Sequence, residues 1–111
     1  MNGTDRKAAI AAYKERRVVA GIYVVRCIAS GERWVGRAPD LDTIRNRLWF
    51  TLRQNLNLSP SLQAAWNARG VDQFAFEELE RLPHEELPYV REAAAKRRLA
   101  HWRAALGATV I

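Results

Sequence analysis

The stretch that decides the fold runs from Gly21 to Gly36, with the sequence GIYVVRCIASGERWVG. Residues 22–28 are almost wholly β-branched, aromatic or apolar, which is typical of a strand covered on both faces. Ser30-Gly31 is a turn signal, and residues 33–36 can return as a second strand. The stretch therefore predicts a β-hairpin that the chain leaves at a glycine.

The segments outside the hairpin predict helices and one further strand. Asp40 can cap a helix with an apolar stripe, Ser59-Pro60 can start another that ends at a left-handed Gly70, and residues 73–79 predict a third strand. Two more helices are expected, one from Asp5 to Val19 and one from Glu85 or Pro88 to about Leu106, stopped by Gly107. The expected fold is α+β, a small three-stranded antiparallel sheet flanked by helices.

The length and charge of the chain limit its organisation and its partners. The 111 residues suit one domain, which we place at 21–106 after an N-terminal helical extension at 1–20. Eighteen Lys and Arg against twelve Asp and Glu give a net charge of +6, which favours nucleic acid and, second, an anionic membrane surface. No apolar run could span a bilayer, and the lone Cys27 fits a reducing, cytoplasmic compartment.

Two short motifs in the hairpin have the residues and spacing of a known family. Gly21-Ile22-Tyr23 and Trp34-Val35-Gly36, with ten residues between Tyr23 and Trp34, resemble the two motifs of GIY-YIG nuclease domains. The resemblance continues over roughly residues 21–82. It includes Asp40-Leu41, Leu62-Gln63, Trp66-Asn67, Gly70 and Phe74-Ala75-Phe76-Glu77.

This resemblance implies hydrolysis of a DNA phosphodiester with one divalent metal ion, Mg²⁺ or Mn²⁺. Tyr23 matches a catalytic tyrosine near the attacking water, and an arginine of the first helix would stabilise charge on the phosphate. An alignment without gaps puts Ile44 in the arginine position. We therefore favour Arg47, one helical turn further, and keep Arg45 as the alternative.

Three positions depart from the family pattern. Trp34 replaces the second tyrosine and cannot act as a base, and Asn57 occupies the expected histidine position. Leu99 occupies the position of the metal-binding glutamate, three residues before Trp102. Glu92 is the acid within that helix and is a candidate substitute ligand, as are the acids between Glu77 and Glu86.

Basic residues away from these positions are candidates for contact with DNA phosphates, although a solvated surface or a helix-dipole role would use the same residues. They are Arg37, Arg53, Lys96, Arg97 and Arg98. His84 and His101 are isolated, so a zinc site is not expected.

Two functional hypotheses remain, with a purely structural interaction module as a third. The chain is either a metal-dependent endonuclease, with full or impaired activity, or a degenerate domain that binds DNA or a protein partner without cleaving. The feature that separates them is a carboxylate close to Tyr23 and Arg47.

Overall fold

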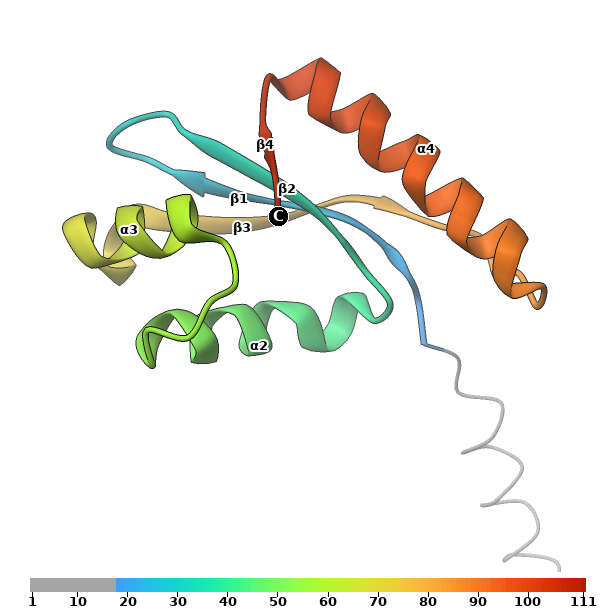
Figure 1. The fold of residues 1–111 in the computed structure, drawn as a ribbon, viewed down its shortest axis with the longest axis horizontal. Coiled ribbons are helices and arrows are strands. Elements are labelled where there is room, and N and C mark those ends of the chain that lie inside the picture. The colour runs from blue at the N-terminus through green and yellow to red at the C-terminus, as the bar shows by residue number, and fades with distance from the viewer. Residues whose placement is uncertain (1–17) are drawn as a thin grey trace, which may run out of the picture.

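The computed structural model describes residues 18–111, and the helix expected from Asp5 lies outside this range as far as residue 17. Val18 and Val19, its expected last two residues, are not helical. The described chain forms four strands and three α-helices (Figure 1). In order these are β1 (Gly21–Cys27), β2 (Arg33–Ala38), α2 (Leu41–Arg53), α3 (Pro60–Arg69), a 3-10 turn η1 (Val71–Gln73), β3 (Phe74–Arg81), α4 (Pro88–Leu106) and β4 (Thr109–Val110).

The strands form one mixed sheet in the order β3-β1-β2-β4. β1 is antiparallel to β2 and β3, as expected, whereas β4 is parallel to β2. The predicted sheet of three antiparallel strands therefore omitted the fourth strand, β4. β4 has only two residues, both exposed, and is fixed by its register with Trp34 and Val35 rather than by an apolar pattern of its own.

The hairpin separates the core into two layers because its side chains alternate between the faces of the sheet. Tyr23, Val25 and Trp34 pack in one apolar cluster with α2 and α3, and Ile22 and Val35 pack in another with α4. Figure 1 shows α2 and α3 on one side of the sheet and α4 on the other.

The ends of the helices follow the sequence signals in most places. The Asp40 side chain accepts a hydrogen bond from the Asp42 amide at 2.9 Å and caps α2, and left-handed Gly107 ends α4. Ser59 precedes α3, but its side chain makes no capping bond. Gly70 has a positive φ of 87° with an extended ψ of 162°, so the expected left-handed helical conformation was wrong there. No helix in residues 18–111 is long and apolar enough to cross a membrane.

Candidate nucleic-acid site

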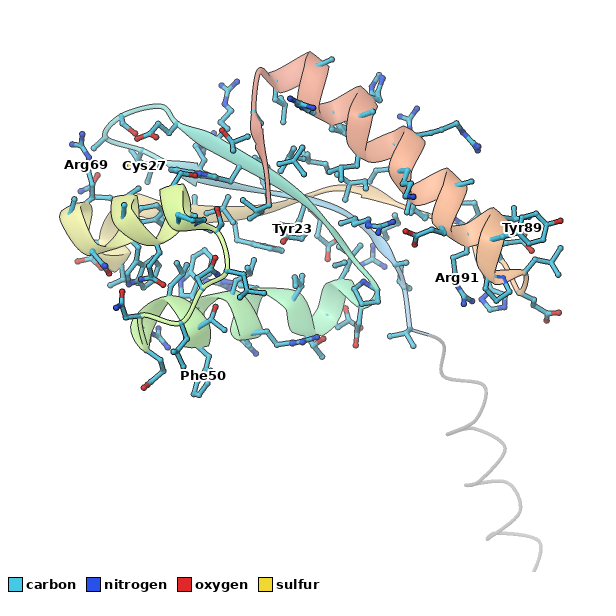
Figure 2. All side chains as sticks on the ribbon, viewed as in Figure 1. Tyr23, Cys27, Phe50, Arg69, Tyr89 and Arg91 are labelled. Atoms are coloured by element: carbon cyan, nitrogen blue, oxygen red, sulfur yellow. The ribbon has the colours of Figure 1, made fainter. Side chains whose placement is uncertain are left out.

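Tyr23 lies inside the molecule, on the face of β1 that α2 and α3 cover. Only 4% of its surface is exposed, and its ring stacks on Phe76 with 5.4 Å between centroids (Figure 2). Gly36 is its register partner on β2, and a Cβ atom there would lie 2.6 Å from Cζ of the tyrosine ring. The ring therefore occupies space that only a glycine leaves open.

The environment of the Tyr23 hydroxyl keeps it protonated. Burial raises the pKa of Tyr23 to about 12, because the phenolate would be poorly solvated there. At neutral pH this hydroxyl can donate or accept a hydrogen bond, but it is a neutral phenol and not the phenolate that would accept a proton from water.

A hollow of about 850 Å³ opens beside Tyr23, and Arg47 lies in its wall. Its lining comes from the sheet with β4, the loop before α2, the helix α2, the loop between α2 and α3, and the first turn of α3. The other lining residues are Pro39, Ile44, Leu48, Thr51, Leu56, Asn57, Leu58, Ser59, Pro60, Ser61, Thr109, Val110 and Ile111.

Of the two candidate arginines, the structure brings Arg47 to this hollow. Ile44 and Thr51, one turn before and after it on α2, line the same wall. Arg45 lies instead over the ring of Trp49, 5.8 Å from its centroid, and does not line the hollow. Among residues 18–111 neither arginine has an ion-pair partner.

Trp34 lies on the same face of the sheet as Tyr23 but inside the core. It is 1% exposed, and its indole Nε1 donates a 2.9 Å hydrogen bond to Oγ of Ser61. Ser61 in turn lines the hollow. The tryptophan thus supports the wall of the site from behind and does not reach its surface.

Comparisons with known proteins identify the fold in which this arrangement occurs. No family model and no curated protein matches the chain. Two solved structures do, both of the catalytic domain of the homing endonuclease I-TevI. One aligns with a TM-score of 0.70 and 24% identity, over 83% of this chain and 97% of that domain. The other, a variant with a glutamate changed to alanine, aligns with a TM-score of 0.69 and 24% identity, over 81% and 86%. This chain has the GIY-YIG nuclease fold.

Asn57, which the sequence comparison aligned with the family's histidine, holds the loop between α2 and α3. Its Nδ2 donates to Oγ1 of Thr51 at 3.0 Å, and its Oδ1 accepts from the Ser59 amide at 2.9 Å. Its own amide donates to Oε1 of Gln63 at 3.0 Å. Since all three groups are hydrogen-bonded, Asn57 fixes the conformation of the loop. Its amide cannot act as a general acid or base.

The residue that the sequence comparison aligned with the family's glutamate, Leu99, lies away from Tyr23. Leu99 packs on the other face of the sheet, in the cluster that contains Ile22, Val35 and Trp102. The nearby acid Glu80 accepts hydrogen bonds from Nε of Arg98 at 2.8 Å and from Nε1 of Trp102 at 2.9 Å. Burial alone would raise the pKa of Glu80, but these two donors hold it below its usual value.

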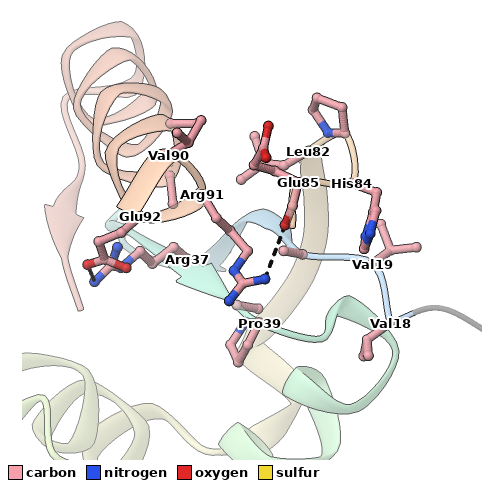
Figure 3. Close-up of a pocket in the computed structure, with 15 residues that line it drawn as sticks. Val18, Val19, Arg37, Pro39, Leu82, His84, Glu85, Val90, Arg91 and Glu92 are labelled. Atoms are coloured by element: carbon pink, nitrogen blue, oxygen red, sulfur yellow. Dashed lines mark hydrogen bonds and ion pairs between the residues drawn. The ribbon is translucent and has the colours of Figure 1, made fainter. Parts of the chain in front are cut away.

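Glu92, the candidate substitute ligand, also lies away from Tyr23. Its carboxylate pairs with Arg37 at 2.6 Å beside a second hollow of about 1060 Å³, between α4 and the start of β1 (Figure 3). The hydrogen bond from Arg37 lowers the pKa of Glu92. The structure thus places Glu92 and Tyr23 at two different hollows.

The donor set of the Tyr23 hollow does not fit a divalent cation. Mg²⁺ and Mn²⁺ prefer carboxylate oxygens, and no Asp or Glu side chain of the described residues lines this hollow. Within residues 18–111, no three His, Cys, Asp or Glu side chains are grouped so that they could hold a metal ion.

The candidate DNA-contact residues divide into two groups. Arg37 and Arg98 are engaged by Glu92 and Glu80, partners that the sequence did not reveal. Arg53, Lys96 and Arg97 are exposed, and no described residue forms an ion pair with them. The sequence also missed Ser61 and the β4 residues at the hollow, since only the fold brings them to Tyr23.

Proposed function

We propose that this domain binds DNA at the hollow beside Tyr23 and does not hydrolyse it. The observation that carries the proposal is the composition of the hollow. It joins an exposed Arg47, which has no ion-pair partner among residues 18–111, to a buried tyrosine, and no Asp or Glu side chain of those residues lines it.

The case for DNA binding starts from the fold and the charge. The fold is that of a homing endonuclease catalytic domain, and the chain carries a net charge of +6. Helix α2 presents Arg45, Arg47 and Arg53, none of which is paired among the described residues. A guanidinium that is not neutralised by a carboxylate can bind phosphate oxygens in a bidentate way.

The case against hydrolysis rests on the missing acid and base groups. A phosphodiester is cleaved by positioning a nucleophile and stabilising the charge that develops, and a metal ion commonly does both. Here Tyr23 stays protonated, and neither Trp34 nor Asn57 can act as an acid or a base near neutral pH. Arg47 can still bind a phosphate, so binding survives where chemistry does not.

Binding is tested by titrating a labelled duplex with the protein at several salt concentrations. We expect steep weakening with salt because phosphate contacts release counterions. Arg47→Ala should weaken binding at low salt about five- to tenfold, the loss of one charge-assisted contact. Arg45→Ala is the matched control on the same helix and should weaken it less. No affinity at low salt would contradict the proposal.

Cleavage is tested with supercoiled plasmid and Mg²⁺ or Mn²⁺. We expect no nicking by the wild type, Tyr23→Phe, Arg47→Ala or Glu92→Gln. Robust nicking by the wild type that Tyr23→Phe and Arg47→Ala abolish would instead establish the endonuclease. Loss in Glu92→Gln as well, with folding and DNA binding intact, would identify Glu92 as the metal ligand.

A further inference from the structure

The hollow beside Tyr23 has more apolar surface than a phosphate-binding site needs. Two leucines of the loop between α2 and α3 line it and are largely exposed, Leu58 by 98% and Leu56 by 66%. Val110 of β4, 42% exposed, is a third apolar side chain in the lining. An exposed apolar patch beside a cation is a feature of binding surfaces.

The loop that carries the two leucines is fixed in its conformation. The side chain of Asn57, between them, is hydrogen-bonded to the Thr51 hydroxyl and the Ser59 amide. The Gln63 side chain donates to the Leu52 carbonyl at 3.0 Å. Asn67 closes the network by donating to Asn55, which adopts a positive φ of 59°. The leucines are therefore displayed by a braced loop that does not fold them into the core.

An intact duplex does not offer the faces of its bases to such a surface. Its bases stay stacked, so it presents phosphates, sugars and base edges. An unstacked nucleotide offers a phosphate together with an apolar base face, and contact with protein side chains is the usual way in which such bases are bound.

We propose that the hollow takes one unstacked nucleotide, with its phosphate on Arg47 and its base against Leu56 and Leu58. The ligand class is DNA that contains a single-stranded gap or end, and this inference rests on the proposed function. Arg47 lies in the wall of the hollow and forms no ion pair within residues 18–111, which favours an anionic ligand here over a protein partner. Arg45 and Arg53, on the same helix, add positive charge nearby.

The test compares the affinities of the full chain, at one salt concentration, for an intact duplex, the same duplex with a short gap, and that gap built from abasic residues. We expect the gapped duplex to bind about five- to tenfold tighter than the other two, as burial of one apolar contact would give. The double variant Leu56→Ser, Leu58→Ser should lose this preference, so that its affinities for the gapped and the intact duplex become equal.

Phe50→Ser is the matched control. Phe50 is 61% exposed on α2 but points away from the sheet and does not line the hollow (Figure 2). It should keep the preference. Equal affinity for gapped and intact duplex would overturn the inference and leave the proposed function standing. A preference that survives the leucine variant, or that abasic residues do not reduce, would also overturn it. No binding to any of the DNAs would overturn both.

Discussion

The two faces of the sheet bury their polar groups in different ways. On the α4 face, Glu80 is matched to Arg98 and Trp102, and Arg37 is matched to Glu92. On the α2 and α3 face, Tyr23 is buried against aromatic rings, and Arg47 stands beside it without an ion-pair partner in the described chain.

This difference separates the charges that hold the fold together from those that remain available to a ligand. On the α4 face Glu80 neutralises Arg98 and Glu92 neutralises Arg37. The hollow on the opposite face has Arg47 in its wall and no Asp or Glu side chain of residues 18–111 in its lining. Each face can therefore be disrupted by a different change.

The largest effect is expected from Gly36→Ala, which breaks the Tyr23 face. The new methyl group would collide with the tyrosine ring, which is buried and stacked on Phe76. We expect a loss of about 3 kcal/mol in the free energy of unfolding, measured with urea. Gly31→Ala, where φ is 78° but no atom lies within 4 Å of the new methyl, should cost only about 1 kcal/mol. Equal losses would contradict this packing.

Alkali should also act on the Tyr23 face. Since the pKa of Tyr23 is raised to about 12 in the folded protein, folding favours the protonated phenol. Its contribution is fully present below the unfolded value near pH 10, and it is lost as the pH rises toward 12. The loss by then is about 2 kcal/mol. Unfolding measured across this range should show a decline that is smaller in Tyr23→Phe. An identical decline in both proteins would refute the assignment.

Acid should act on the α4 face through Glu80. Its pKa is lowered in the fold, so the stability that it contributes is present above the unfolded pKa and is lost as the pH falls through the folded one. Glu80→Gln removes the charge on its bonds to Arg98 and Trp102 and should cost about 1.5 kcal/mol at pH 7. The variant and the wild type should converge in stability at low pH, and a constant gap would argue against this role.

The smallest effect is expected from the bond behind the hollow. Trp34→Phe removes the donor to Ser61 and should cost about 1 kcal/mol beyond the change in packing. A double-mutant cycle with Ser61→Ala isolates this bond, because Ser61 is exposed and its single variant should change little else. A coupling energy near zero would show that the bond is unimportant for stability.

The sequence predicted those parts of the molecule that have local signals. The hairpin, the Asp40 cap and the final helix follow from alternation, capping chemistry and a terminal glycine. β4 could not be predicted, because two exposed residues have no pattern of their own and depend on a partner strand about 75 positions earlier.

The candidate site was predictable only in part. Tyr23 and Arg47 came from motif and helical spacing, and the structure puts them at one hollow. The pairing of Arg98 with Glu80 and of Arg37 with Glu92 could not be foreseen, since each joins residues far apart in the sequence. The exposed leucines gave no signal either, because an apolar residue in a loop can lie inside or outside a core.

The lack of space for a side chain at Gly36 has a consequence for how such sequences are surveyed. Both motif glycines are required by space: a side chain at Gly36 would meet Tyr23, and one at Gly21 would meet the Glu80 backbone and Leu41. Selection for folding alone would retain them in a descendant that no longer cuts DNA. A survey that counts the glycine and tyrosine motif therefore counts folded scaffolds. Under the function proposed above, the residues aligned with Trp34, Asn57 and Leu99 are the ones to compare between domains that cleave DNA and domains that only bind it.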